Sequence, residues 1–155
     1  MILDSSAIVA VVLREPGFET LLEKIVEAPS VAVGAPTLAE AGIVLSARLG
    51  QDARGLLARF VQEGAILSIP FSDAHFGAAV GARLRFGKGR HPAALDFGDC
   101  LSYAVATLAG EPLLRVGDDF PQTHRASTPW RSPHSLPSGA WSRSAGVLEV
   151  PPRRP

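Results

Sequence analysis

Acidic residues recur where the apolar segments of this chain end. Asp4 interrupts the apolar opening MILDSSAIVA, Glu40 lies in TLAE, and Asp99 lies in FGDC. Two more acids, Asp118 and Asp119, follow the apolar run EPLLRVG. An isolated carboxylate that is buried costs several kcal/mol of stability. Acids placed beside apolar runs are therefore expected to cap a helix or to bind a ligand.

Each of these acids also has a structural interpretation. TLAE is a capping-box sequence with Thr37 as the N-cap and Glu40 three residues later, and DFGD can be interpreted in the same way with Asp96 as the N-cap. Asp4 can cap a helix that begins near Ser5, and the last two acids are of a type common in turns. Taken singly, the acids leave capping and ligand binding open.

Capping does not explain why so many acids should meet at one place. Carboxylates within a few ångströms of one another repel and raise one another's pKa. Mg²⁺ or Mn²⁺ removes this repulsion, because hard cations take carboxylate oxygens and retain waters that leave room for a phosphate. A cation held in this way activates a water and stabilises charge on a phosphodiester. The acids therefore predict hydrolysis of phosphodiester bonds.

An alternation of strands and helices is expected to position these acids. Short apolar runs predict strands near residues 1–3, 30–35, 65–71 and 111–117. Segments of helical periodicity fill the intervals at 6–15, 18–28, 37–50, 53–64, 73–87 and 97–110. This order predicts an α/β fold, a three-layer α/β/α sandwich with a central parallel sheet. The carboxyl ends of parallel strands share one edge, where such folds bind ligands, so the acids should meet there.

Composition limits the class of protein. The chain has 155 residues, which suits a single compact core, and its one cysteine, Cys100, cannot form an intrachain disulfide and is expected to be a small core residue. No apolar run reaches the roughly 18 residues of a membrane span, and the N-terminus lacks a signal-peptide pattern. We therefore expect a cytoplasmic protein without membrane contact, in which any metal has oxygen ligands.

The net charge of zero hides a division along the chain. Residues 121–155 contain five arginines and one acid, Glu149, which leaves residues 1–120 with 10 basic and 14 acidic residues. Within this acidic part, a basic stretch without intervening acids contains Arg83, Arg85, Lys88 and Arg90. A polyanion partner and a solvated helix end explain this stretch about equally well.

Four segments, in order and spacing, resemble the PIN-domain ribonuclease toxins of VapBC toxin–antitoxin systems. They are MILDSSAIVAVV, TLAEA, GKGRHPAALDFGDCLSYAVATLAGEPLL and GDDFPQT, and HPAALDFGDCLSYAVA is the most specific part. The resemblance covers residues 1–123 and implies a PIN domain with a parallel sheet between helices. It also implies a Mg²⁺-dependent endoribonuclease that cuts RNA of the translation apparatus, a homodimer, and inhibition by a cognate VapB-type antitoxin.

The resemblance assigns the chemistry to particular acids. The expected catalytic residues are Asp4, Glu40, Asp99 and Asp119. Of these, Asp4 and Asp99 are the expected ligands of Mg²⁺, with Mn²⁺ as an alternative ion. Glu40 would bind the metal or position the attacking water. Asp118, at a position that varies more among relatives, is the alternative fourth acid and otherwise a supporting residue.

Neighbouring residues have supporting roles in the same resemblance. Ser6 matches a hydroxyl position close to the metal, and Asp96 is expected to act as an N-cap or to orient a metal ligand. The basic residues from Arg83 to Arg90 would hold the RNA backbone. His91 is expected to contact RNA or to shape its loop, because relatives use no histidine as a metal ligand.

The resemblance ends near residue 123. Residues 124–155 are rich in proline, serine and arginine and show no sustained period, so they are predicted to form a disordered tail. Because the departure is abrupt, our hypothesis is a shifted reading frame near His124 or an appended, unrelated extension. The run LLRVG also differs from relatives, which tend to carry a lysine before the glycine.

Three other functions fit parts of this pattern. One is a catalytically weak or inactive PIN module that mainly binds its antitoxin, although such a module has no need of all four acids. Another is phosphoryl transfer to Asp4, as in haloacid-dehalogenase-like phosphatases, but that chemistry requires a second aspartate where this chain has Ser6. The third is an unstable, inactive remnant left by the altered tail.

Overall fold

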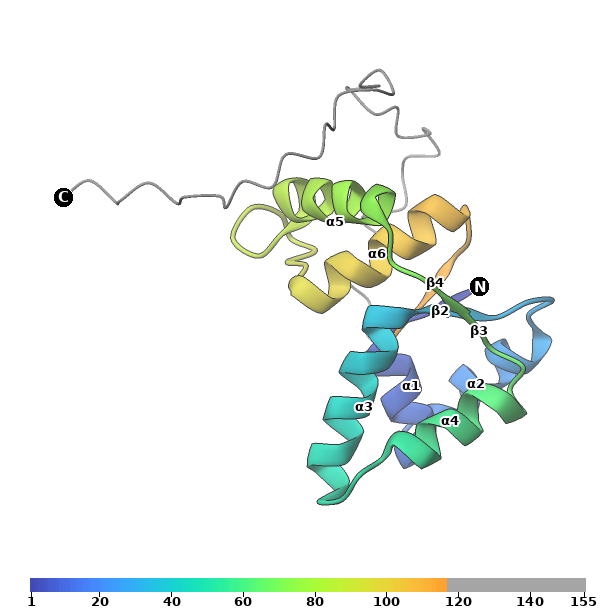
Figure 1. Ribbon diagram of the computed structural model, residues 1–155. Coiled ribbons are helices and arrows are strands. Elements are labelled where there is room, and N and C mark those ends of the chain that lie inside the picture. Colours follow the sequence, from blue (N-terminus) through green and yellow to red (C-terminus); the bar gives the residue numbers. More distant parts are fainter. Residues whose placement is uncertain (117–155) are drawn as a thin grey trace, which may run out of the picture. The chain divides into compact units, whose positions relative to one another are not determined.

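The core of the structure is a parallel sheet of four strands in the order β3-β2-β1-β4 (Figure 1). This computed structural model describes residues 1–116, so the predicted acids Asp118 and Asp119 and the predicted tail lie outside the described residues. The strands are β1 (Ile2–Leu3), β2 (Ala32–Gly34), β3 (Leu67–Ile69) and β4 (Leu113–Leu114). The predicted parallel sheet is confirmed. Its strands are shorter than the apolar runs from which they were predicted.

Helices cover both faces of the sheet. Within residues 1–116 they are α1 (Ser5–Leu13), α2 (Phe18–Glu27), α3 (Ala35–Leu49), α4 (Arg54–Glu63), α5 (Asp73–Phe86) and α6 (Phe97–Ala109). Helices α1 to α4 lie on one side of the sheet, and α5 and α6 lie on the other (Figure 1). The three-layer α/β/α sandwich predicted from the sequence is therefore confirmed.

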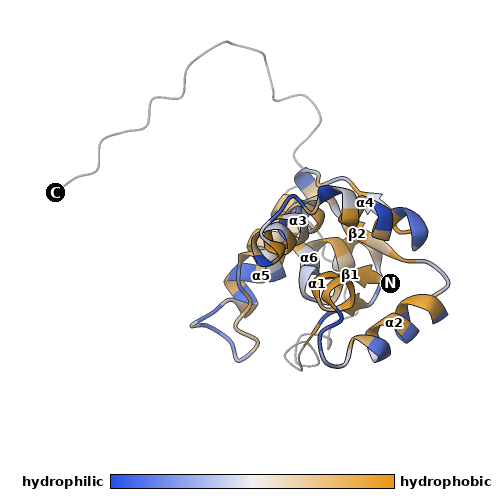
Figure 2. Ribbon diagram, turned by 90° about the horizontal axis from the view of Figure 1, so that it is seen from below, coloured by the Kyte–Doolittle hydropathy of each residue, from blue (hydrophilic) through white to orange (hydrophobic). Residues whose placement is uncertain are grey.

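Alternation along the short strands divides the buried side chains between two cores. The row formed by Leu3, Val33 and Leu114 packs with α1 to α4. The row formed by Ile2, Ala32 and Leu113 packs against α6. Burial of each large apolar side chain stabilises the fold by about 1.5–3 kcal/mol. Figure 2 shows hydrophobic residues along β1 and α1, which are largely buried, and a mixture of hydrophobic and hydrophilic residues on α2 and α4.

Helix α3 begins earlier than the sequence predicts. Its first residue is Ala35, its N-cap is Gly34, and a proline lies in its first turn, where the missing N–H has no helical partner. Thr37 is therefore inside the helix and buried, with its Oγ1 3.0 Å from Oγ of Ser102 on α6. The interpretation of Thr37 as N-cap, with Glu40 in the first turn, is wrong.

Two expectations from composition can be compared with the described residues. Cys100 is buried in the core beneath α5 and α6, and burial raises the pKa of its thiol. None of the helices in residues 1–116 combines the length and the apolar character that a membrane crossing requires.

Candidate active site

The predicted acids of the described residues lie at the carboxyl edge of the sheet. From β1 the sheet grows outward through β2 to β3, and the chain then returns to place β4 on the other side of β1. In open α/β sheets, the strand ends beside such a reversal form the ligand site. Asp4 directly follows β1, α3 with Glu40 directly follows β2, and Arg115 directly follows β4.

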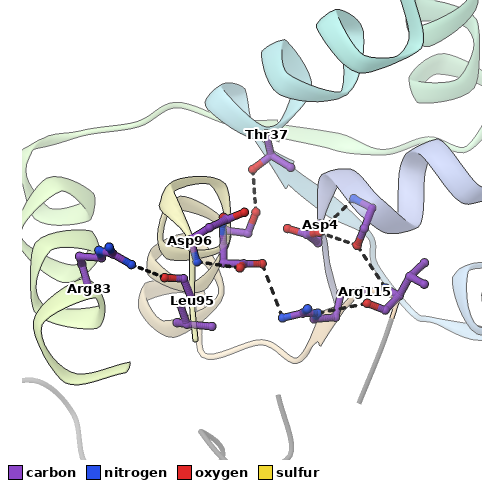
Figure 3. Close-up of polar contacts among 10 residues, drawn as sticks. Asp4, Thr37, Arg83, Leu95, Asp96 and Arg115 are labelled. Carbon is purple, nitrogen blue, oxygen red and sulfur yellow. Dashed lines mark hydrogen bonds and ion pairs between the residues drawn. The ribbon is translucent and has the colours of Figure 1, made fainter. Parts of the chain in front are cut away.

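Asp4 caps α1, one of the two roles that the sequence left open, and it also presents its carboxylate at this edge. It is only 4% exposed. Its Oδ2 accepts a hydrogen bond from the backbone N of Ser6 at 3.0 Å and another from Ser6 Oγ at 2.6 Å. Ser6 Oγ in turn accepts from the backbone N of Val116 at 3.1 Å (Figure 3). Ser6 therefore joins the end of β1 to the segment after β4 and fixes the orientation of Asp4.

Glu40 reaches the site from α3 by packing against the first turn of α6. A Cβ on Gly98 would lie 2.5 and 2.6 Å from the two carboxylate oxygens of Glu40, so this approach requires glycine. Burial raises the pKa of Glu40, a hydrogen bond from Ser5 lowers it, and the neighbouring aspartates of the site raise it. The N-terminus of α6 favours an anion at this position.

Asp96 and Asp99 form the reciprocal capping box that DFGD predicts. Asp96 Oδ1 accepts from the backbone N of Asp99 at 2.9 Å, and Asp99 Oδ2 accepts from the backbone N of Asp96 at 2.9 Å. The other oxygen of Asp99, Oδ1, lies 3.5 Å from Nη1 of Arg115. Only this second oxygen can change partners without breaking the cap of α6.

The pKa of Asp99 reflects the other charged side chains around it. Burial raises the pKa of Asp99, and the hydrogen bond from the Asp96 backbone lowers it. The carboxylate of Asp96 raises the pKa, the guanidinium of Arg115 lowers it, and Asp4 raises it further. Carboxylates from separate segments thus lie close enough to oppose one another's ionisation, which creates a field that attracts a cation.

Arg115 is a site residue that the sequence analysis did not identify. Its side chain, 15% exposed, runs from the end of β4 toward the start of α6, near Asp96 (Figure 3). The sequence feature that could have identified Arg115 is its position directly after the last apolar run, at the carboxyl end of a strand. Gly98 and Ser5 carry no sequence signal for their place in the site, because contacts with a carboxylate that lies far along the chain leave no local pattern.

The donor set suits a hard divalent cation by type, because Asp4, Glu40 and Asp99 offer only carboxylate oxygens. Within residues 1–116, no three acidic, histidine or cysteine side chains converge closely enough to enclose a metal ion by themselves. The predicted fourth acid, Asp119, lies beyond this part of the chain, and Oδ1 of Asp99 faces Arg115. The described acids therefore fit the cation in chemistry, and Oδ1 of Asp99 is paired with Arg115.

The basic stretch lies at the end of α5 and in the loop that follows. Arg83 Nη1 donates to the backbone O of Leu95 at 2.6 Å, which ties α5 to the segment entering α6 (Figure 3). The guanidinium of Arg85 lies over a neighbouring aromatic ring, 5.1 Å from its centroid. Lys88 and Arg90 are exposed on the loop. The four basic residues therefore span the last turn of α5 and the loop after it, and Arg83 also holds this loop in place.

Local contacts shape the same loop. Gly87 pairs with Leu95 in an isolated parallel bridge. His91 Nδ1 accepts a hydrogen bond from the backbone N of Ala93 at 3.1 Å, and its ring meets Phe86 edge-on with centroids 5.2 Å apart. These contacts give His91 the loop-shaping role that was one of its two expected roles.

An apolar groove lies apart from the acids. It encloses about 750 Å³ between α3 and α4 and is lined mainly by apolar side chains, including Leu38, Ile43, Leu57 and Val61. Among the described residues, Asp4, Glu40 and Asp99 do not line it. The groove has no carboxyl with a raised pKa, whereas Glu40 and Asp99 have raised pKa values at the sheet edge, so the edge is the stronger candidate site.

The structure is an α/β domain with a group of acidic residues at the sheet edge where the strand order reverses. The PIN domain family matches residues 1–126 of the sequence, and the chain belongs to this family. The match includes all the candidate acids, and it extends slightly past the boundary at residue 123 that the motifs suggested.

Several relatives are VapC ribonucleases. Ribonuclease VapC36 of Mycobacterium tuberculosis is 48% identical over 124 residues, which cover 79% of this chain and 89% of the relative. Ribonuclease VapC of Mycolicibacterium smegmatis is 34% identical over 127 residues, covering 82% of this chain and 98% of the relative. The resemblance to VapC-type PIN-domain proteins is therefore confirmed.

A solved structure supports the fold independently of sequence identity. Mycobacterium tuberculosis VapC20, described as a toxin that cleaves the sarcin-ricin loop, is similar with a TM-score of 0.65 at 18% identity. The similarity covers 79% of this chain and 94% of that chain. It establishes a shared PIN-like architecture.

Proposed function

We propose that this chain is a Mg²⁺-dependent endoribonuclease that acts as the toxin of a type II toxin–antitoxin system and inhibits translation. The observation that carries the proposal is the gathering of Asp4, Glu40 and Asp99 at the carboxyl edge of the sheet. Membership of the PIN domain family and the names of the VapC relatives support it.

In this proposal Asp4 and Asp99 hold the cation, and Asp119 is the fourth acid, with Asp118 as its alternative. Mg²⁺, or Mn²⁺ in its place, supplies a Lewis acid for the phosphate and a nucleophilic water at neutral pH. Ser6 orients Asp4 through their 2.6 Å hydrogen bond. Asp96 orients Asp99 through the capping box.

Glu40 is proposed to position the attacking water and to accept its proton. Its raised pKa brings it closer to neutral pH, which suits a general base. Attack on the phosphorus with departure of the 3′ oxygen leaves a 5′-phosphate and a 3′-hydroxyl. Arg85, Lys88 and Arg90 are proposed to hold the RNA backbone beside the site, and Arg83 to contribute while it fixes their loop.

The proposed partners follow from the same assignment. A cognate VapB-type antitoxin would place a basic segment in the acidic site, where an arginine can replace the charge of the metal. A homodimer is also proposed, and α5 offers an apolar surface for it in Phe76, Val80 and Leu84, which are 65%, 44% and 58% exposed. We place this RNA-directed activity in the cytoplasm. Sedimentation that shows only a monomer at micromolar concentration would count against the dimer.

A direct experiment compares cells expressing the chain alone with cells that also express the neighbouring gene, and then maps RNA ends. We expect growth arrest and new 5′-phosphorylated RNA ends with the chain alone, and relief of both by the antitoxin. Purified protein should make the same cuts in Mg²⁺ and none in excess EDTA. A folded protein that binds Mg²⁺ but produces no new ends would contradict the proposal.

The catalytic domain is proposed to end near residue 123, followed by a divergent segment without catalytic residues. Residues 128–155 contain one acid, Glu149, and several arginines. A chain that ends at Ser127 should therefore keep Mg²⁺-dependent cleavage and lose RNA affinity mainly at low salt, since the removed charge acts through counterion release. Loss of folding in this shortened chain alone would show that the boundary is misplaced.

A further inference from the structure

The arginine after the last strand lies against one metal-ligand candidate. Nη1 of Arg115 is 3.5 Å from Oδ1 of Asp99, and this guanidinium lowers the pKa of Asp99. Both side chains are largely shielded from water, with 15% of Arg115 and 20% of Asp99 exposed. An ion pair of this kind is less screened than a surface pair. Arg115 is thus a cation built into the acid site.

The hydrogen bonds of Asp99 decide which oxygen a metal ion can take. Oδ2 accepts from the backbone N of Asp96 and completes the capping box, so its loss would uncap α6. Oδ1 lies beside Arg115 and does not take part in the capping box. Oδ1 is therefore the oxygen of Asp99 that is free of the helix cap, and a divalent cation that binds it meets the guanidinium of Arg115.

We propose that Arg115 competes with the divalent cation for Oδ1 of Asp99. In the metal-free protein the guanidinium offsets the repulsion among Asp4, Glu40 and Asp99, and metal binding displaces it from Asp99. The inference rests on the proposed metal-dependent function and adds a regulatory property to it. Arg115 weakens the affinity for Mg²⁺ and stabilises the metal-free fold, so cleavage requires a higher concentration of Mg²⁺.

The test measures metal affinity directly by calorimetric titration with Mn²⁺ and with Mg²⁺. Arg115→Met removes the charge and keeps an unbranched side chain about as long as the stem of the arginine. Its matched control is Arg59→Met, because Arg59 is paired with Glu63 at 3.1 Å on α4 and is exposed. We expect Arg115→Met to bind the cation roughly tenfold more tightly than the wild type, the scale of one charge acting at short range. The affinity of Arg59→Met should stay at the wild-type value.

Thermal melting provides a second measurement that does not depend on cleavage. Without metal, Arg115→Met should melt at a lower temperature than the wild type, and saturating Mg²⁺ should raise its melting temperature by more. Arg115→Gln, measured in parallel, replaces it if the methionine variant fails to fold. Arg115→Lys, which keeps the charge, should remain closer to the wild type in both measurements.

The outcomes separate this inference from the proposed function. Tighter metal binding in the neutral Arg115 variants, with an unchanged Arg59 control, supports the competition. Wild-type protein that binds Mg²⁺, together with neutral Arg115 variants that bind it equally or more weakly, overturns the inference and leaves the ribonuclease proposal intact. Absence of metal binding in the wild type and in every variant overturns both.

Discussion

The acid site and the basic stretch carry opposite charges in contrasting surroundings. Asp4, Glu40 and Asp99 come from separate segments and are largely shielded from water, and Asp4 raises the pKa values of both Glu40 and Asp99. Lys88 and Arg90 are close together in the sequence and project from a connecting loop. Charges that converge in a shielded site interact strongly, whereas exposed charges are screened by water and salt. A single substitution should therefore have a far larger effect in the acid site than in the loop.

The largest effect is expected for Asp4→Asn. Asparagine can still cap α1 and accept from Ser6, but it removes a metal-ligand charge. Cleavage should fall by at least about a hundredfold, more than loss of an indirect metal contact usually costs. Metal-free stability should hold or rise, because the repulsion of Glu40 and Asp99 by Asp4 is relieved.

Single-turnover cleavage and thermal melting measure these two quantities for Asp4→Asn. The matched control is Asp52→Asn, which neutralises an exposed aspartate paired with Arg54 and should leave cleavage unchanged. If Asp4→Asn cuts RNA at the wild-type rate in Mg²⁺, the assignment of Asp4 as a metal ligand is wrong.

A smaller loss is expected for Gly98→Ala, which tests the position of Glu40 without removing its charge. The new Cβ would displace both carboxylate oxygens, which it would otherwise approach at 2.5 and 2.6 Å. Because these atoms end a flexible side chain, stability should change little while cleavage falls by about ten- to a hundredfold. Gly81→Ala in α5 is the control, since its Cβ meets nothing within 4 Å. That control should keep full activity and gain about 0.5–1 kcal/mol of stability.

The stability of the metal-free protein should depend on pH, because burial and neighbouring carboxylates disfavour the ionised form of Glu40. The pKa of Glu40 lies above its ordinary value of 4.5 when the protein is folded. Between these two values the folded protein binds more protons than the unfolded chain, so the free energy of unfolding falls as pH rises through that window. Denaturant titrations at a series of pH values from 4.5 upward measure this slope.

Glu40→Gln should reduce that slope, because it removes one group that takes up a proton, and Asp99, whose pKa is also raised, should supply the remainder. Asp52→Asn is again the control, since hydrogen bonds from Arg54 lower the pKa of Asp52 to about 2 and it is ionised throughout the window. Saturating Mg²⁺ should oppose the trend, because metal binding favours the deprotonated acids. An identical slope in Glu40→Gln and wild type would show that folding does not raise the pKa of Glu40.

The smallest effect is expected in the basic loop. The double substitution Lys88→Ala with Arg90→Ala should weaken RNA binding several-fold at low salt and progressively less as salt increases. The slope of log affinity against log salt should decrease by roughly one for each lost phosphate contact. Arg59→Ala on α4 serves as the control for loss of an exposed positive charge. Equal loss at low and high salt would indicate a contact other than backbone charge.

Residues near in sequence explain the parts of the fold that could be predicted. Ile2 and Leu3 belong to opposite cores, so a buried parallel strand is apolar at every position and is recognisable as a short apolar run. DFGD forms the expected capping box because all its partners lie within one helical turn. TLAE does not, because the end of β2 sets the start of α3. There Gly34 packs closely on α6, where an added Cβ would lie 2.9 Å from Val105.

The sequence alone determined the strand and helix order, the identity of the acids and their placement after buried strands, since each depends on local composition and spacing. Only the tertiary structure decided that Gly98 admits Glu40 and that Arg115 lies against Asp99. It also paired Thr37 with Ser102. These contacts depend on the strand order and on the packing of α3 beside α6. Both are set by long-range burial of apolar surface, which leaves no local signal in the sequence.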